Sequence, residues 1–271
     1  MLNVWKILPI TIAVCGVVSG QTWNHDLGSK LGPLSWGYLD AYNGFATCGT
    51  DKQAVGARQT PINIAAKGAV PTDLPALKFN YVPTTLVVEN LNHVVEVVNE
   101  QADSALLVGT ALADKYKLVQ FHFHTPSEHK IDDAGADMEV HFVHQNALGE
   151  LAVVGVMIKA DNGKANPLLD KIFNNAPYLS FFGQANSASA PLGEINPVEL
   201  LPEKKSYYTY SGSLTTPPCS EGVHWYVMTE PVYVSNSSVT IYQRILQANS
   251  RFQFNNRPIQ PLNSRPVLVT K

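Results

Sequence analysis

The sequence has few cysteines, few charged residues and no marked excess of either charge. Of its 271 residues, 15% are charged, and 19 lysines and arginines against 22 aspartates and glutamates give a net charge of −3. No basic cluster is present that would attract nucleic acid, so we expect no nucleic-acid partner. The chain also has no internal repeat and no low-complexity linker. Its length and its evenly scattered turn residues favour one large domain.

Long apolar runs are absent outside the N-terminal stretch "MLNVWKILPITIAVCGVVSG". This stretch has one lysine, an apolar run from Ile7 to Val18 and then small residues. A membrane span needs about 20 apolar residues, so the pattern predicts a cleaved signal peptide over residues 1–20 rather than an anchor. The C-terminal "PLNSRPVLVTK" has no hydrophobic tail typical of a lipid-anchor signal. We therefore expect residues 21–271 to be a single secreted, extracellular domain without a membrane anchor; the sequence gives no indication of its oligomeric state.

The three cysteines agree with an extracellular location. Cys15 belongs to the expected signal peptide, which leaves Cys48 and Cys219. An even pair in an oxidising compartment favours a disulfide over two free thiols. The sequon "NSS" makes Asn236 a candidate glycosylation site, although one of its serines equally suits the cap of a helix.

Period-two alternation of apolar and polar residues dominates the middle of the chain. Runs rich in β-branched and aromatic residues predict strands: "TLVVENLNHVVEVVN", as one or two strands around a turn at Leu91 and Asn92, "KLVQFHFH", "MEVHFVHQN", "ELAVVGVMIKA" and "VHWYVMTEPVYV". Two short stretches have helical spacing instead: "NPLLDKIFNNAP", with Asn166 as N-cap and Pro167 in the first turn, and "SSVTIYQRILQAN". We expect a mainly β protein with a mostly antiparallel sheet and a few short peripheral helices.

Three of the eight histidines fall within the ten residues "QFHFHTPSEH". In an extended strand, Gln120, His122 and His124 share one face, and two phenylalanines share the other. The phenylalanine face is an ordinary core face. Two imidazoles and an amide, in contrast, are costly to bury without partners.

A second histidine strand, "MEVHFVH", contains His141. If the two strands are neighbours, His122, His124 and His141 converge, and three imidazoles with one open position are the ligand set of a catalytic zinc. A ligating histidine needs an acceptor for its other ring N–H. Gln120 lies two residues before His122, and Glu139 lies two residues before His141, so each shares a face with its histidine. This arrangement favours a metal site over three satisfied core histidines.

The other histidines have weaker patterns. Facing parity places His144 on the opposite side of its strand from His141. We expect His144 and His129 to be buried structural histidines, and His25 and His224 carry no independent indication of function.

Five motifs, in chain order "ARQTPINI", "QFHFH", "MEVHFVH", "YSGSLTTPPCSE" and "NNRPIQPLN", together resemble the α-class carbonic anhydrases. The resemblance runs from about Trp23 to about Leu262. It implies a large, twisted, mostly antiparallel sheet with Zn²⁺ at the base of a cone. It also implies the reversible hydration of carbon dioxide to bicarbonate and a proton by zinc-bound hydroxide. His122, His124 and His141 match the zinc ligands of this family.

The same resemblance implies roles for four further polar residues. Thr215 matches the threonine that accepts the proton of the zinc-bound hydroxide, and Glu128 matches the glutamate that holds this threonine. Thr216 matches the neighbour that helps to place bicarbonate. His93 matches the histidine that shuttles protons to solvent.

Further positions match by type and place. Gln120 and Glu139 match the acceptors behind the zinc ligands, and Cys48 and Cys219 match a disulfide of secreted members. The apolar wall against which carbon dioxide sits is matched by Val143, Val153, Leu214, Val223 and Trp225.

The resemblance fails beside the proton route. The family usually has a tyrosine two residues after the first tryptophan of its N-terminal signature, and His25 stands there in this chain. Leu91 replaces a frequent asparagine, Asn92 a usual glycine, and Glu96 a usual asparagine or glutamine. We therefore expect proton transfer, rather than the hydration step, to limit turnover.

Two other functions compete with this interpretation. "HFHTPSEHKIDDAG" also fits a cupin pattern in which Glu128, with His122 and His124, binds iron or manganese. However, Tyr116 stands where a cupin has its preceding glycine, and no second cupin block follows. The other alternative is a catalytically weak or silent binding or storage protein on the same fold. The sequence does not indicate the physiological direction of the reaction or its biological role.

Overall fold

The computed structural model describes residues 23–39, 45–49, 58–99, 101, 105–109, 115–179, 187–250 and 252–271. The expected signal peptide and Cys15 lie outside these ranges. None of the helices within them combines the length and the hydropathy needed to cross a membrane.

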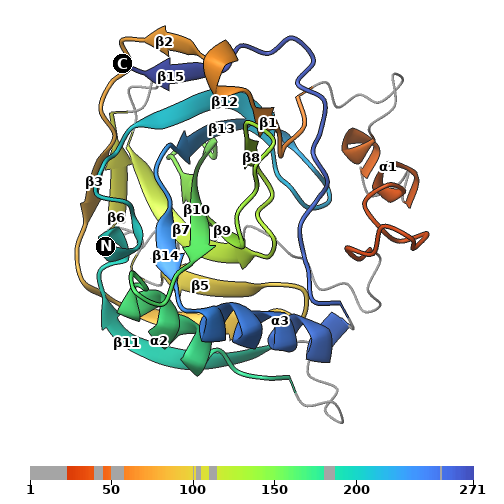
Figure 1. The fold of residues 1–271 in the computed structure, drawn as a ribbon, viewed down its shortest axis with the longest axis vertical. Coiled ribbons are helices and arrows are strands. Elements are labelled where there is room, and N and C mark those ends of the chain that lie inside the picture. Colours follow the sequence, from red (N-terminus) through yellow and green to blue (C-terminus); the bar gives the residue numbers. More distant parts are fainter. Residues whose placement is uncertain are drawn as a thin grey trace, which may run out of the picture.

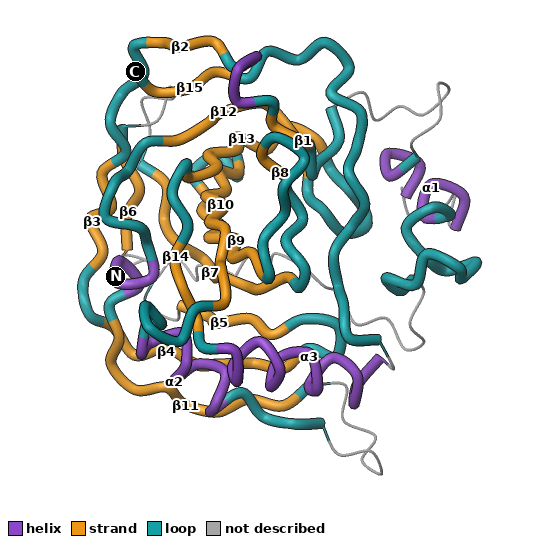
Figure 2. Tube along the Cα trace, in the orientation of Figure 1, coloured by secondary structure: helices purple, strands orange, loops and turns teal. Residues whose placement is uncertain are grey.

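One mixed sheet organises the described part of the chain (Figures 1 and 2). Its main path runs through β11 (Ala188–Ile195), β4 (Thr84–Asn90), β5 (Val95–Asn99), β7 (Tyr116–His124), β9 (Met138–Gln145), β10 (Leu151–Ala160), β13 (Glu221–Met228), β12 (Tyr207–Ser213), β15 (Leu268–Thr270) and β2 (Val70–Thr72). Three strands join beside this path: β3 (Lys78–Tyr81), β6 (Ala105–Val108) and β14 (Val232–Val234). Parallel pairing is confined to β10 with β13 and β14, and to β15 with β2, among the strands of this sheet that the structure describes. The expected large, mostly antiparallel sheet is confirmed.

A separate pair of short parallel strands, β1 (Asn63–Ile64) and β8 (Lys130–Ile131), lies beside the large sheet. The expected strand "VHWYVMTEPVYV" is in fact two strands, because β13 ends at Met228 and β14 begins at Val232. Pro231, which lacks the N–H that a ladder requires, lies in the break.

In the described part of the chain the helices are few and peripheral, as expected. They are α1 (Trp36–Leu39), α2 (Pro167–Asn175), α3 (Asn236–Ser250) and short 3-10 helices at Phe45–Cys48, Ala66–Gly68 and Pro197–Leu200. Asn166 caps α2 by accepting a hydrogen bond from the Leu168 N–H, as predicted. The expected cap of α3 is wrong: the hydroxyl of Ser235, which precedes the sequon, accepts from the Ser238 N–H at 3.2 Å.

The alternation in β7 is interrupted once, and this interruption decides which residues face the metal centre. The register against β9 shifts between Leu118 and Gln120, which leaves Val119 as an extra residue. A bulge of this kind reverses the alternation of side chains. Leu118 and Phe121 therefore both lie in the main core, which α2 and α3 cover. Gln120 and the two histidines that follow point to the opposite face.

A disulfide between Cys48 and Cys219 joins the N-terminal segment to the loop between β12 and β13. The predicted pairing is thus confirmed. The fully buried Arg257 reinforces the same junction, because its guanidinium donates to the carbonyl oxygens of Thr60 at 2.8 Å and Cys48 at 3.1 Å. The ring of Trp36 packs against this guanidinium, with its centroid 5.7 Å from Cζ of Arg257.

We predict that the double variant Cys48→Ser/Cys219→Ser has a lower free energy of unfolding, by up to about 5 kcal/mol, because the disulfide closes a long loop in the unfolded chain. Urea denaturation of both proteins measures the difference, and a reducing agent should affect only the parent. A loss below about 1 kcal/mol would mean that the sheet and Arg257 hold the junction without the disulfide.

Candidate metal centre

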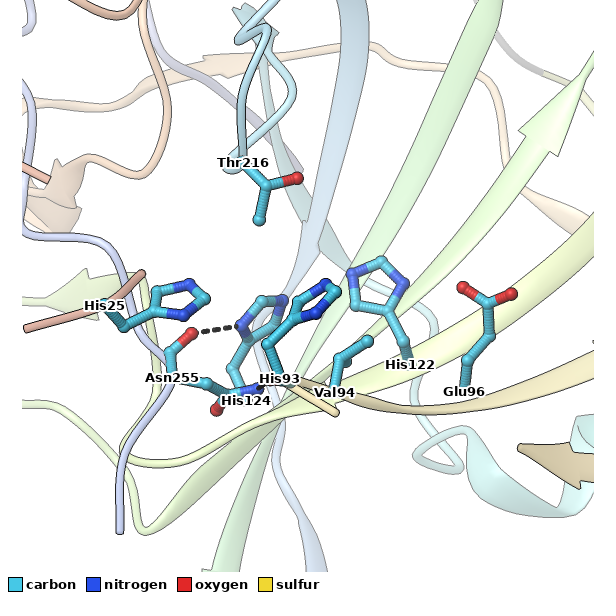
Figure 3. A pocket seen from close by; sticks show the side chains of 8 residues that line it. All are labelled: His25, His93, Val94, Glu96, His122, His124, Thr216 and Asn255. Carbon is cyan, nitrogen blue, oxygen red and sulfur yellow. Dashed lines mark hydrogen bonds between the residues drawn. The ribbon is translucent and has the colours of Figure 1, made fainter. Parts of the chain in front are cut away.

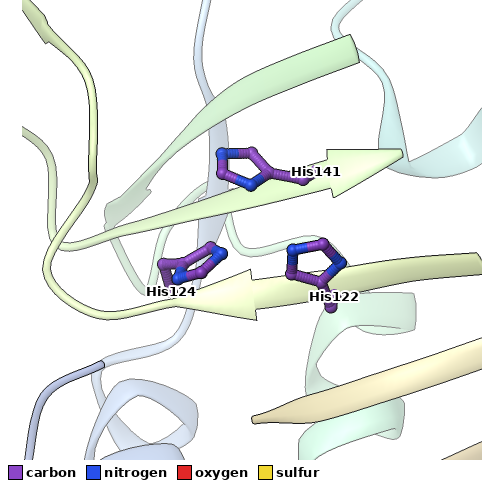
Figure 4. A group of neighbouring side chains, drawn as sticks. All are labelled: His122, His124 and His141. Atoms are coloured by element: carbon purple, nitrogen blue, oxygen red, sulfur yellow. The ribbon is translucent and has the colours of Figure 1, made fainter. Parts of the chain in front are cut away.

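Three histidine side chains converge on the sheet face opposite the main core (Figure 4). His122 and His124 come from β7, and His141 comes from the neighbouring antiparallel strand β9, directly opposite His122. One ring nitrogen from each histidine lies within 4.8 Å of the others. The two strands are neighbours, as predicted, and their pairing brings the three imidazoles together.

The two predicted acceptors are in contact with their histidines. Nδ1 of His122 donates to Oε1 of Gln120 at 2.8 Å, and Nε2 of His141 donates to Oε1 of Glu139 at 2.8 Å. Because an oxygen acceptor fixes the proton on the facing nitrogen, each ring presents its other nitrogen as a lone pair.

The third histidine uses an acceptor that the sequence did not reveal. Nδ1 of His124 donates to the backbone carbonyl of Asn255 at 3.0 Å. Nε2 of His124 is buried and has no hydrogen-bond partner among the described residues. The nitrogens left over are Nε2 of His122, Nε2 of His124 and Nδ1 of His141.

This donor set fits zinc. Burial lowers the pKa of all three histidines. The pKa of His122 lies well below its usual value, because the neighbouring histidines lower it further, and the pKa of His124 falls to about 4. All three rings are therefore neutral at pH 7, which is the form that binds a metal. Glu128 is not one of the converging ligands in the described residues. The cupin alternative, which requires it as a ligand, is therefore wrong.

Glu139 is the best-connected polar group near the centre. Its fully buried carboxylate accepts from the backbone N–H groups of Glu128 and His129 at 2.8 Å each, from Nδ1 of His129 at 2.7 Å and from His141. Burial alone would raise its pKa, but His129 and His141 lower it well below the usual value. Glu139 is thus ionised throughout the neutral range.

His129 and His144 have structural surroundings, as expected. Nε2 of His129 bonds to the Tyr210 hydroxyl at 2.6 Å, and Tyr210 in turn donates to Oγ1 of Thr60 at 3.2 Å. His144 lies on the other face of β9, where Nδ1 donates to the carbonyl of Ala152 at 3.2 Å and Nε2 bonds to the Tyr81 hydroxyl.

Glu128 also lies beside the centre, but it has fewer hydrogen bonds than Glu139 and a raised pKa. Oε1 accepts from the backbone N–H of Arg257 at 2.7 Å, whereas Oε2 has no regular hydrogen bond to a described residue. Burial raises the pKa of Glu128 to about 7, against lowering contributions from His141, Arg257 and the Thr215 hydroxyl. The structure thus places Glu128 and Thr215 next to each other.

The apolar residues singled out in the sequence form one group on the site's face of the sheet. Trp225 lies with its ring 4.8 Å from the ring of His141, and its indole N–H donates to the carbonyl of Ser213 at 3.0 Å. The buried members of the cluster include Val143, Val153, Val223 and Trp225, with Leu214 packed against them.

A cavity opens from the metal centre toward the turn between β4 and β5 (Figure 3). Its lining comprises His25, His93, Val94, Glu96, His122, His124, Thr216 and Asn255. Asn92 stands where the resemblance implies a glycine. Its φ of 76° lies in the left-handed region, which asparagine tolerates best among non-glycine residues. The turn carrying His93 therefore accommodates this departure. His25, to which no function was assigned from the sequence, lines the same cavity.

Comparisons with known proteins agree with this geometry. The family model described as "Eukaryotic-type carbonic anhydrase" matches residues 43–271. A carbonic anhydrase of Nostoc sp. is 37% identical over 253 residues, which cover 92% of this chain and 86% of that protein. The α-carbonic anhydrase of Thermovibrio ammonificans, solved with the inhibitor sulfanilamide, is 36% identical with a TM-score of 0.78, covering 92% of this chain and 98% of that one. Dioscorin complexed with ascorbate is 29% identical with a TM-score of 0.78, covering 91% and 97%.

We predict that Glu139→Gln weakens zinc binding about 10- to 100-fold, because the amide no longer supplies the anion that orients His141. Competition with a chromophoric chelator measures the dissociation constant. The matched control is Glu194→Gln, which neutralises an exposed carboxylate on β11. Equal affinities in the Glu139 and Glu194 variants would contradict the assigned role of Glu139.

Proposed function

This chain belongs to the eukaryotic-type (α) carbonic anhydrase family, whose reaction is the reversible hydration of carbon dioxide to bicarbonate. We propose which of its residues carry out each part of this reaction. His122, His124 and His141 hold the zinc ion, each through the ring nitrogen that faces away from its acceptor. The observation that carries this proposal is the hydrogen bond behind each ring, since it orients the free lone pair toward the common centre. Zinc held by three imidazoles lowers the pKa of a coordinated water toward neutrality, as is known for carbonic anhydrases, and so supplies a nucleophile at neutral pH.

Thr215 and Glu128 orient the attacking water. A threonine hydroxyl has one proton to donate, and the adjacent carboxylate oxygen of Glu128 is an acceptor without another regular hydrogen bond. With its proton directed to Glu128, Thr215 uses its lone pairs to accept from the water. The water's own lone pair is then free to face the substrate.

Carbon dioxide is apolar, so its binding site needs apolar walls close to the nucleophile. The cluster containing Val143, Val153, Val223 and Trp225 provides such a wall, and Leu214 packs against it one residue before Thr215. Thr216 lines the cavity from the same loop. A hydroxyl at this place suits the oxygens of bicarbonate, the more polar partner of the reaction.

The proton released by hydration leaves through the cavity that His93 lines. Imidazole is suited to this transfer, because its usual pKa lies close to physiological pH. Burial and the neighbouring His124 lower the pKa of His93 to about 4. His93 is therefore neutral at pH 7 and able to accept a proton, but it is a weak base.

Several features support an extracellular location. A disulfide such as Cys48–Cys219 persists in oxidising compartments. Asn236 is exposed at the first turn of α3, where a glycan has room. We propose a single secreted domain over residues 21–271, preceded by a signal peptide over residues 1–20 and glycosylated at Asn236.

We predict rapid carbon dioxide hydration in stopped-flow measurements, with one zinc per chain in the same sample. His122→Ala should lose both zinc and activity.

Thr215→Val should retain zinc but lose about 10²-fold in kcat/KM, because a positioned hydrogen bond is removed. His224→Ala, a half-buried histidine outside the cavity lining, is the matched control. Zinc without hydration in the parent would favour the alternative of a silent binding or storage protein.

We further predict that kcat rises with buffer concentration, because proton transfer limits turnover. His93→Ala should lower kcat at low buffer concentration while kcat/KM stays unchanged, since kcat/KM reports the hydration step and not the exit of the proton. Turnover that is independent of buffer, with His93→Ala as fast as the parent, would contradict this assignment.

A further inference from the structure

The cavity between the metal centre and the surface is lined by two histidines that are not metal ligands (Figure 3). His93 lies in the turn between β4 and β5, and His25 comes from the N-terminal segment. Their rings are nearly parallel, 27° apart, with centroids separated by 6.5 Å.

His25 is held firmly in place by aromatic neighbours. Its ring makes edge contacts with Trp23 at 5.3 Å and with Trp36 at 5.6 Å. Trp23 also contacts the ring of His93 at 5.0 Å, so one indole supports both histidines. Their relative placement is therefore fixed by packing.

His25 nevertheless has a polar atom that packing does not satisfy. The residue is 5% exposed, and its Nε2 has no hydrogen-bond partner among the described residues. A buried polar atom without a partner has a cost in stability. An apolar ring would fill the space between the two tryptophans without this cost, so packing alone does not account for a histidine here.

We propose that His25 is a second proton-carrying histidine, which works beside His93 to move the proton of hydration from the cavity to solvent. The proposal rests on the function assigned above and extends it to a residue outside the family's usual route. Hydration consumes one water and one carbon dioxide and yields bicarbonate and one proton. That proton binds a ring nitrogen of either histidine and then passes to a buffer base.

The electrostatic surroundings limit the pair to one proton at a time. Burial, His93 and His124 lower the pKa of His25 well below its usual value, and burial and His124 lower the pKa of His93 to about 4. Both rings are thus neutral at pH 7, and a charge on one disfavours a charge on the other. Glu96 is the only carboxylate in the lining of this cavity among the described residues.

Two substitutions separate proton carriage from the other roles of His25. His25→Phe keeps an aromatic ring but removes all hydrogen bonding. His25→Tyr keeps a ring and a hydroxyl that can order water, but its usual pKa of about 10 prevents it from carrying protons at neutral pH. His224→Phe is the matched control, since it removes a histidine that does not line the cavity.

The experiment is stopped-flow carbon dioxide hydration at low buffer concentration, with zinc content measured on each sample. We expect both His25 variants to lower kcat about three- to tenfold, with kcat/KM within about twofold of the parent. Added imidazole should restore kcat. The double variant His25→Tyr/His93→Ala should fall below either single variant.

Three results would overturn the proposal. Parent-like kcat in His25→Tyr would show that His25 only orders water, and a double variant equal to His93→Ala would show that it only positions His93. Loss of zinc or of kcat/KM would show a structural role. Failure of the assigned function is distinguishable from all three, because the parent itself would then show no hydration.

Discussion

The buried carboxylate of Glu139 is the group on which the rest of the site depends. A charge with no exposure to solvent is tolerated only when its oxygens are fully hydrogen-bonded. Glu139 meets this condition with four donors: two backbone N–H groups and the rings of His129 and His141. These bonds fix the turn that carries Glu128 and the orientation of one metal ligand together. Gly155 belongs to the same arrangement, because a Cβ at this position would lie 3.1 Å from Oε1 of Glu139.

The two buried glutamates differ because their donors differ. Glu139 has four donors and a pKa well below its usual value. For Glu128, burial raises the pKa to about 7, because the Arg257 N–H is its one regular donor among the described residues. A dication at the three histidines favours the ionised form of a carboxyl nearby. We expect Glu128 to be ionised when the metal is bound, as its proposed role of accepting a hydrogen bond from Thr215 requires. Glu139 is an anion in either case.

The sequence revealed those parts of the site that depend on alternation within a strand. The common face of Gln120, His122 and His124, and the acceptors two residues before two of the ligands, follow from period-two geometry. The acceptor of His124 could not be found in this way, because it is a backbone carbonyl, which any residue type provides, and Asn255 is 131 residues distant. The bulge at Val119 could not be predicted from the sequence either. The alternation of side chains from Gln120 onward is the same whether or not the residues before it are in register.

The metal ligands and the proposed proton route belong to different structural units. This explains why the departures from the family pattern fall beside the proposed route. The ligands lie on β7 and β9, in the middle of the sheet. The proposed route lies on a turn and on the N-terminal segment, which the disulfide and Arg257 attach to the body of the protein. Asn255 joins the two units. Its side-chain amide donates to the carbonyls of His93 at 3.1 Å and Phe123 at 3.0 Å, and its backbone carbonyl accepts from His124. Because this link uses backbone atoms of the turn, side chains along the route can change without displacing a ligand.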